Sequence, residues 1–471
     1  MGCRSYTWLL LTIAPAAAAA QGFGIYEQGT CEMGRASAAV ADPCPDGSAI
    51  FFNPAAIAGL SGGHATAGVT LLDVSGSFTD NLFGQKTTLN DPLIPVPHAY
   101  VTYAVTPKLG VGIGLFAPYG LQTEWPTTFD GRFSGYNNIV HTYYVQPTVA
   151  YQVSPRLKIG VGIDYVHGTV ELHQRLDLSQ ALVPLAGVPA GTTFGQFGVP
   201  SGSDFADATL QASQSGVGAH IGALLTINDR LAIGARYLTQ VSLTYNGTAQ
   251  FTQIPTGLVT PASLTVGALT LPAGTNLDQF LAAPPSAGGL GLFLPGGLLA
   301  AQAVTAAIPN PDMLVLGVAY KAMPSLTLLA DYQWTHWAAF SVLSLRFTPD
   351  TSLNQQLYQD YQNTSTIRLG AEWVKSDALT IRVGYLYNQA AAPDQTVTPL
   401  LPEGARNELT AGVTAKLAPR VTAAVAYQYI HQNDRLGRTR ETPNVQPTTA
   451  LNDGLYTFGA SLFAATLSVA F

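Results

Sequence analysis

The sequence has few charged residues and no long apolar run after its first twenty positions. Only 10% of its 471 residues are Asp, Glu, Lys or Arg, whereas 47% are hydrophobic and 47 residues are glycine. A soluble domain usually carries about 25% charged residues, so this composition excludes an ordinary water-soluble globular protein. No later stretch supplies the roughly 20 apolar residues of a membrane-spanning helix. The remaining class is a closed transmembrane β-barrel, because lipid tolerates no unpaired strand edge.

Basic residues and reactive motifs are also scarce. The 21 basic residues are outnumbered by 28 acidic ones, which excludes a nucleic-acid partner because such a partner needs a clustered basic face. The eight histidines show no HExxH or Cys/His metal spacing, and no GxSxG occurs. We therefore expect no metal, no cofactor and no catalysis. An outer-membrane lipase barrel is the enzymatic alternative.

Cysteine is rare, and one of the three cysteines lies in an N-terminal targeting segment. Residues 1–20, "MGCRSYTWLLLTIAPAAAAA", combine one Arg, an apolar stretch and a small-residue tail, which is typical of a cleaved secretory signal. A membrane anchor is the alternative, but the run is too short. Removal of this segment changes the formal net charge from −7 to −8. Cys31 and Cys44 remain. In an oxidising compartment they could form a disulfide, and two buried thiols are the alternative.

A short polar turn followed by an alternating strand recurs six times. The six stretches are "VTPKLGVGIG" (105–114), "VSPRLKIGVG" (153–162), "INDRLAIGAR" (227–236), "AMPSLTLLAD" (322–331), "KSDALTIRVG" (375–384) and "LAPRVTAAVA" (417–426). Tight turns of this kind are typical of the periplasmic side of outer-membrane barrels, and long variable connections separate them. Six short turns, with both chain ends on the same side, predict an all-β, 14-stranded antiparallel barrel over residues 63–471.

The alternation also predicts which face of each strand touches lipid. In "TIRVGYLY" (380–387), Ile381 and Val383 share the outer face while Arg382 points into the lumen. An apolar exterior and a polar interior indicate that lipid is the outer solvent. The chain ends on the alternating strand "SLFAATLSVAF". Trp334, Trp337 and Trp373 are predicted to lie in the aromatic belt at the membrane interface.

Residues 21–62 precede the first strand and lack the turn signature. They include "AIFFNPAAIAGL", an apolar run that Pro54 keeps from being an ordinary strand and that needs burial. A barrel of about fourteen strands has a lumen that its side chains do not fill. We therefore predict that this segment is a hatch inside the lumen. A disordered periplasmic tail is the alternative, but it would need a more polar composition.

These blocks together resemble the FadL family of outer-membrane channels for long-chain fatty acids and other hydrophobic compounds. The resemblance covers the mature chain and rests on the stretches "MGRASAAVADPCPDGSAIFFNPAAIAGL", "PHAYVTYAVTPKLGVGIGLFAPYGLQTEW", "YQWTHWAAF", "IRLGAEW" and "LPEGARNELTAG". Asn53, Pro54 and Ala55 match the family's Asn-Pro-Ala hatch motif, which implies a part in gating. The pair Cys31 and Cys44 is outside this pattern.

The resemblance implies capture of cargo by apolar loops, a pocket beside the hatch, and lateral release through a kinked third strand. Two long connections, about 174–209 and 253–309, have the expected apolar character, although a lid packed on itself is the alternative. The third strand is expected over Leu109 to about Pro118. There Gly110, Gly112, Gly114 and Phe116 point inward, leaving either a side opening or room for the hatch.

A fatty-acid cargo would also need a partner for its carboxylate. Candidates predicted to point inward are Lys158, Arg236, Arg346, Arg368 and Arg382. Asp164, Asp331, Glu372 and Glu408 share the lumen, so these charges could instead pair with one another.

We therefore expect a monomeric channel in the outer membrane of a Gram-negative bacterium. Its partners would be the lipid around it and a long-chain fatty acid or another hydrophobic molecule. A channel for aromatic or alkane hydrocarbons, a water-filled porin and an adhesion barrel are the alternatives.

Overall fold

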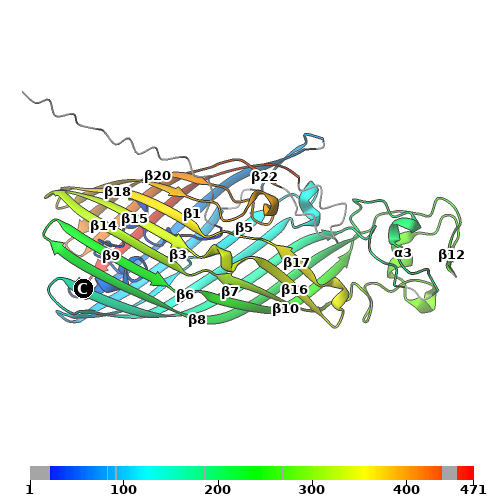
Figure 1. The fold of residues 1–471 in the computed structure, drawn as a ribbon, viewed down its shortest axis with the longest axis horizontal. Helices are drawn as coiled ribbons and strands as arrows, with labels where there is room; N and C mark the ends of the chain where they lie inside the picture. The colour runs from blue at the N-terminus through cyan, green and yellow to red at the C-terminus, as the bar shows by residue number, and fades with distance from the viewer. Residues whose placement is uncertain (1–21, 82, 91–92, 185–186, 268, 438–452) are drawn as a thin grey trace, which may run out of the picture.

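The protein is a long barrel with an apolar lobe beyond one end and the C-terminus at the other (Figure 1). The computed structural model describes residues 22–81, 83–90, 93–184, 187–267, 269–437 and 453–471. The predicted signal peptide, residues 1–20, lies outside the described residues. No described helix is both long enough and apolar enough to cross a membrane.

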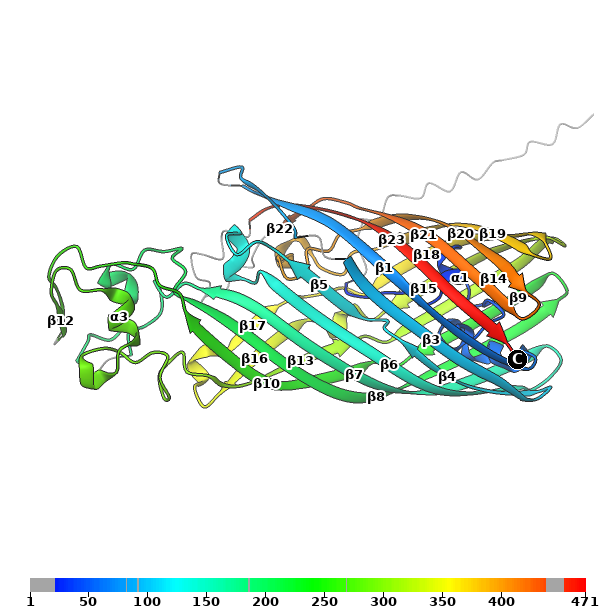
Figure 2. The same ribbon diagram turned by 180° about the vertical axis from the view of Figure 1, so that it is seen from behind.

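The barrel wall has fourteen strand positions, each antiparallel to its neighbours, which confirms the predicted count. Eight positions are single strands: β1 (Gly63–Asp80), β3 (Leu93–Thr106), β6 (Asn137–Gln152), β7 (Leu157–Leu176), β8 (Ala206–Asn228), β19 (Leu379–Asn388), β20 (Arg406–Ala418) and β23 (Gly454–Ala470). The wall closes where β1 pairs with β23 from His64 opposite Ala470 to Asp80 opposite Gly454. These two strands lie side by side in Figure 2.

The other six positions are strands broken into two pieces. They are β4 (Leu109–Phe116) with β5 (Gly120–Glu124), β9 (Leu231–Leu238) with β10 (Val241–Gln253), β14 (Met313–Met323) with β13 (Gln302–Asn310), β15 (Leu326–Thr335) with β16 (Val342–Thr348), β18 (Thr364–Ser376) with β17 (Gln355–Tyr358), and β21 (Val421–Gln432) with β22 (Arg435–Gly437). A further short strand, β2 (Lys86–Thr88), extends the edge of β1.

All six predicted tight turns connect neighbouring strands at the end where the C-terminus lies. The predicted alternation of faces also holds over most of the wall. On β19, for example, Val383 is exposed and Arg382 is buried. The order of short turns and alternating strands was therefore sufficient to predict the barrel.

Residues 22–62, which we call the hatch, lie inside the barrel. The hatch contains α1 (Thr30–Met33), α2 (Ala49–Phe52) and the short 3-10 helix η1 (Pro54–Gly59). Its hydrogen bonds reach several strands of the wall, including Thr70 Oγ1 to the Glu27 carbonyl, Tyr100 Oη to the Gln28 carbonyl, and Asn53 Nδ2 to the Ala223 carbonyl. The apolar run "AIFF" is completely buried, as its composition required.

The two long connections, residues 177–205 and 254–301, form the lobe beyond the barrel (Figures 1 and 2). The second is shorter than predicted because Gln302–Asn310 continue the wall as β13. The lobe contains η3 (Phe194–Phe197), β11 (Leu264–Val266), β12 (Leu269–Leu271), α3 (Leu277–Ala282) and η4 (Pro285–Ala287). Shorter 3-10 helices elsewhere are η2 (Asp130–Phe133), η5 (Trp337–Ala339), η6 (Thr351–Leu353) and η7 (Asp394–Thr396).

Candidate functional site

The Asn-Pro-Ala stretch of the hatch is packed flat against the wall. Asn53 Nδ2 donates to the carbonyls of Val40 (2.7 Å) and Ala223 (3.0 Å), and its Oδ1 accepts from the Ala55 N–H (3.1 Å). Asn53 therefore caps η1 and also ties it both to the rest of the hatch and to β8. Wall glycines allow this approach. A Cβ on Gly222 would come within 2.2 Å of Asn53 Oδ1.

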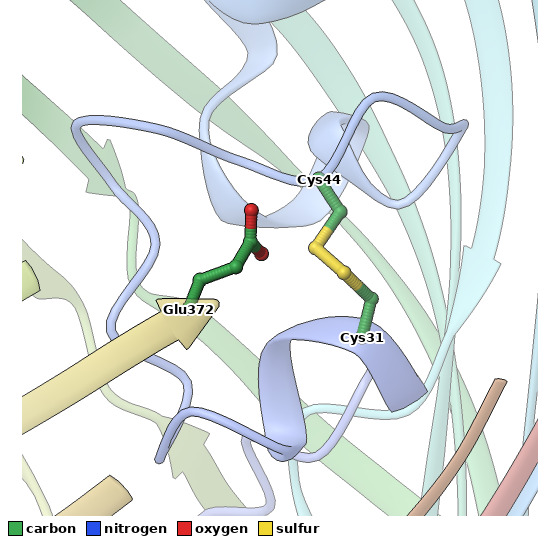
Figure 3. A group of neighbouring side chains, drawn as sticks. All are labelled: Cys31, Cys44 and Glu372. Carbon is green, nitrogen blue, oxygen red and sulfur yellow. A yellow bond between two sulfur atoms is a disulfide. The ribbon is translucent and has the colours of Figure 1, made fainter. Parts of the chain in front are cut away.

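A disulfide joins Cys31 and Cys44 and so closes the loop between α1 and α2 (Figure 3). Glu32 lies inside this loop, where its Oε1 accepts from the Cys44 N–H (3.1 Å) and the Ser48 hydroxyl (2.8 Å). Burial, with a contribution from Asp46, raises the pKa of Glu32 to about 7. Figure 3 also shows Glu372 facing the two sulfurs. Because both sulfurs are used in the disulfide, these three residues cannot act as a thiolate metal site.

Three of the predicted carboxylate partners hold the hatch instead of facing open space. Arg382 and Arg35 of the hatch share the carboxylate of Glu372, at 2.7 Å and 3.1 Å. Arg236 donates to the Phe51 carbonyl (2.7 Å) and lies 4.4 Å from the centre of the Phe51 ring. Arg368 lies 4.9 Å from the centre of the Tyr26 ring.

The other two candidates lie elsewhere. Lys158 points inward at the far end of the hatch, where its Nζ lies 2.0 Å from the position of a Cβ built on Gly59. The inward placement of Arg346 is wrong, because Arg346 is exposed and its neighbours Leu345 and Phe347 are buried. At this level the inner wall is apolar, so polarity no longer indicates the inner face.

One tryptophan, Trp337, also points into the lumen where the inner wall is apolar. Trp337 is fully buried in the lumen, with its ring centre 4.8 Å from that of Phe23, so its predicted place in the membrane-interface belt is wrong. The cause is the break between β15 and β16, which carries η5 inward. Trp334 and Trp373 remain on the wall, and Trp373 is exposed.

The inward glycines of the third strand are in contact with the hatch. A Cβ on Gly110 would lie 2.4 Å from the Ile57 carbonyl oxygen, and one on Gly112 would lie 2.8 Å from Ile50 Cδ1. Gly114 has Tyr100 and Ile50 at similar distances. Over this stretch β4 is fully paired with β3 and β6. The glycines therefore provide room for the hatch, and the wall is continuous beside them.

The third strand breaks immediately after this stretch. Phe116 is buried against Phe51, with ring centres 5.1 Å apart, and Pro118 lies in the break. Beyond the break, β5 pairs only with β6 among the described strands. Residues 93–98 of β3 pair with β1 but have no partner on the opposite side in the described chain. The wall is thus open between the first half of β3 and β5.

The sequence contained a signal for this opening that the search for glycines missed. The unpaired half of β3 reads "LIPVPH", with Pro95 and Pro97 on the same face. Proline has no N–H to donate and in sheets is confined largely to edges. Two prolines at this spacing remove donors that an open edge would leave unsatisfied.

A cavity of about 160 Å³ occupies this opening. It is lined by Ile94 and Val96, which face the lumen, and also by Pro95 and Pro97, which face outward. Successive residues of a strand point to opposite faces. The cavity therefore touches both faces of this unpaired strand edge.

The first residues of the hatch form the inner boundary of the cavity. We call residues 22–27 the hatch limb. Its backbone bonds to the broken strand, with Ile25 N–H donating to the Pro118 carbonyl (2.8 Å) and Gly120 N–H to the Phe23 carbonyl (3.0 Å). The limb therefore lies along the break and separates the opening from the rest of the lumen.

The cavity lining is mostly apolar but includes four charged side chains: Glu27, Glu403, Arg406 and Glu408. Each carboxylate accepts at least two hydrogen bonds, among them Gly22 N–H to Glu403 (3.1 Å), Gln428 to Glu27 (2.9 Å) and Asn388 to Glu408 (2.7 Å). Arg406 was absent from the predicted candidates. Its inward direction follows from strand alternation, but its presence at the opening does not.

The apolar residues of the lobe are largely buried against one another. Their shared core is Leu178, Val183, Phe194, Phe197, Val199, Phe205, Ala206, Leu271, Leu277, Phe280, Leu281, Leu292 and Leu299. Asp278 pins the lobe by accepting from the N–H groups of Thr256 and Gly257, which lower its pKa although partial burial opposes them. The structure thus favours the alternative in which these connections pack on themselves. Leu182 and Val259 remain exposed.

Comparison with known proteins agrees with this architecture. Residues 11–471 match the family described as "Outer membrane protein transport protein (OMPP1/FadL/TodX)". The chain is 22% identical to a long-chain fatty acid transport protein of Salmonella typhi over 421 residues, 87% of each chain. A crystal structure of a Pseudomonas aeruginosa FadL homologue superimposes with a TM-score of 0.75 and 20% identity, covering 96% of this chain and all of that one. The Ralstonia pickettii toluene transporter TbuX gives 0.63 and 19%, covering 95% and 100%. The chain therefore belongs to the OMPP1/FadL/TodX family, is located in the outer membrane of a Gram-negative bacterium, and is a transport protein, not an enzyme.

Proposed function

We propose that the protein is a passive uptake channel for hydrophobic molecules, which leave it sideways through the opening between β3 and β5. The observation that carries this proposal is the single cavity lined by both faces of β3. A route through the wall delivers an apolar molecule directly to the hydrocarbon of the membrane. The molecule avoids water, and each methylene kept out of water contributes about 0.8 kcal/mol.

The hatch limb is the part that would move. It forms the inner boundary of the cavity, whereas the rest of the hatch is fixed by the disulfide, by Asn53 and by the Glu372 ion pairs. A small displacement of residues 22–27 would join the cavity to the lumen. The glycines of β4 and the Asn-Pro-Ala stretch then keep the remaining hatch in place during transport.

Long-chain fatty acids are the cargo we favour, because a relative is named for them and because Arg406 provides a cation at the cavity. Small aromatic hydrocarbons are the second candidate. The cavity of about 160 Å³ is close to an engineered cavity of roughly 150 Å³ that binds benzene. A solved structure of similar fold is that of a toluene transporter.

Filling the opening tests the proposed route. Leu121 lines the cavity from β5, so Leu121→Trp should block the passage and reduce uptake of labelled oleate at least tenfold in cells lacking their own channel. The matched control is Val101→Trp on β3. Val101 is exposed to the lipid side at a position where β3 is paired on both sides, so its variant should transport normally.

Two outcomes would refute the route. One is a Leu121→Trp protein that assembles at normal levels and transports oleate at the wild-type rate. The other is a steady, large ionic conductance of the wild-type protein in planar bilayers, which would indicate a water-filled porin. Separate uptake assays with oleate and toluene distinguish the two cargo classes.

A further inference from the structure

The six tight turns at the C-terminal end of the barrel are rich in basic residues (Figure 1). Each turn, taken with the last three residues of the strand before it, carries at least one exposed Lys or Arg. The same stretches contain only two acidic residues, Asp229 and Asp377. The whole chain has 21 basic and 28 acidic residues, so this excess of positive charge is local to one end of the barrel. We call these basic residues the basic rim: Lys108, Arg156, Arg230, Lys321, Lys375, Lys416 and Arg420.

The protein does not neutralise the charges of the basic rim by itself. All of its side chains are exposed, and none of the ion pairs of the described chain includes one of them. Arg382 in the lumen is different, because it is paired with Glu372 at 2.7 Å. Like charges arranged around one ring repel one another, and external anions that bind them relieve this repulsion.

The basic rim lies at the level of the membrane surface. On four strands an exposed aromatic side chain lies within three residues of the strand end, namely Tyr103, Tyr151, Tyr320 and Trp373. Aromatic side chains in such positions mark the boundary between hydrocarbon and water. A rim residue follows each of them after one to five positions. Because Lys and Arg have long side chains, their charged ends reach the layer of lipid head groups.

The lipid layer beside the rim supplies a suitable anion. Short turns of an outer-membrane barrel face the periplasm, so the neighbouring lipids are the phospholipids of the periplasmic leaflet. Lys and Arg bind phosphate oxygens through charge-assisted hydrogen bonds. The rim residues come from turns around the whole circumference and do not form one compact patch. This arrangement fits many small ligands around the barrel better than a single soluble partner.

We propose that the basic rim binds the head groups of anionic phospholipids in the periplasmic leaflet and gathers a shell of these lipids around the barrel. In a zwitterionic phospholipid, the ammonium group offsets the charge of the phosphate, so anionic lipids are preferred. Each basic residue near an anionic membrane surface strengthens binding about fivefold. The interaction is independent of the proposed function, because it involves the turns and not the cavity.

Quenching of Trp373 fluorescence by brominated phospholipids measures which lipid lies beside the rim. Trp373 is exposed and lies two residues from Lys375 on β18, whereas Trp125 and Trp337 are fully buried. The substitution Trp334→Phe removes the remaining tryptophan of the described chain. The full-length protein is placed in phosphatidylcholine vesicles that contain a small fraction of brominated lipid. At low salt, brominated phosphatidylglycerol should bind beside Trp373 at least fivefold more strongly than brominated phosphatidylcholine.

Neutralisation of two rim residues near the probe should remove this preference. Lys375 lies on the same strand as Trp373, and Lys321 lies two strands away on β14. Lys321→Gln/Lys375→Gln should bring the ratio of the two binding constants close to one, and Lys321→Arg/Lys375→Arg should retain the preference. The matched control is Lys86→Gln/Arg346→Gln, which changes the net charge equally at the opposite end of the barrel and should have no effect.

Four results would overturn the inference. The first is equal quenching of the wild-type protein by the two brominated lipids. The second is an unchanged preference in Lys321→Gln/Lys375→Gln, and the third is an equal loss of preference in the control, which would indicate an effect of net charge alone. The fourth is a preference that persists in 1 M salt, where charges beyond about 3 Å are screened. Equal quenching together with rim-dependent retention of soluble peptidoglycan fragments would assign the rim to an acidic polymer instead.

Discussion

Replacement of Asn53 should loosen the hatch while leaving the barrel intact. Asn53→Ala removes three buried hydrogen bonds, those to the carbonyls of Val40 and Ala223 and the cap on the Ala55 N–H. At about 1 kcal/mol for each bond, the local free energy of opening should fall by about 3 kcal/mol. That corresponds to a roughly hundredfold faster exchange of the amides of α2 and η1.

A second substitution separates the two parts of this effect. Asn53→Asp keeps an oxygen that can cap Ala55 but loses the donor, and it places a carboxylate against the two carbonyls. We therefore expect Asn53→Asp to open the hatch at least as readily as Asn53→Ala. The assay is hydrogen exchange of the purified protein, with the β1–β23 amides as internal reference.

Two results would contradict this reasoning. If Asn53→Asp behaved like wild type, capping alone would account for the role of Asn53, and the ties to Val40 and β8 would be energetically unimportant. If the reference amides of β1 and β23 exchanged as fast as those of η1, the substitution would have damaged the barrel and not the hatch.

Three further predictions concern the hatch and the wall it packs against. The double variant Cys31→Ser/Cys44→Ser should lower the local stability of α1 and the loop after it by about 3 kcal/mol, the value for closing a loop of about 15 residues. Hydrogen exchange of the amides in this loop measures the change. Exchange equal to that of the wild type would contradict the prediction. The pKa of Glu32 is raised in the folded protein, so ionisation of Glu32 opposes folding of the hatch. Protection of the hatch amides from hydrogen exchange, corrected for intrinsic exchange rates, should therefore be highest at acidic pH and fall as the pH rises from about 4.5 to about 7. Glu32→Gln should abolish this pH dependence. Gly112→Leu with Gly114→Leu should displace α2 and impair oleate uptake without preventing assembly, measured by uptake together with the amount of folded protein in the outer membrane; normal uptake by the assembled protein would show that the hatch accommodates both side chains.

Local features of the sequence were enough to predict the barrel. A tight polar turn determines its own conformation, and the alternation in "TIRVGYLY" depends only on which solvent each face meets. The hatch was predictable for the same reason, since "AIFFNPAAIAGL" could neither form an ordinary strand nor remain in water.

The functional site was harder to predict from the sequence, because its residues come together only in the folded chain. Assignment of faces by polarity succeeded for Lys158 and Arg382 but failed for Arg346 and Trp337, where the lumen wall is itself apolar. The charges predicted to bind cargo mainly hold the hatch. Arg406 reaches the cavity because β20 passes the hatch limb, which is far away in sequence. Pro95 and Pro97 were the one local signal of the opening.

The seam between β1 and β23 imposes an order of events during biogenesis. Gly62 joins the hatch directly to β1, and the last residue, Phe471, exchanges hydrogen bonds with Gly63 (2.9 Å and 2.8 Å). The barrel is therefore closed only when β23 has paired with β1, the strand that directly follows the hatch.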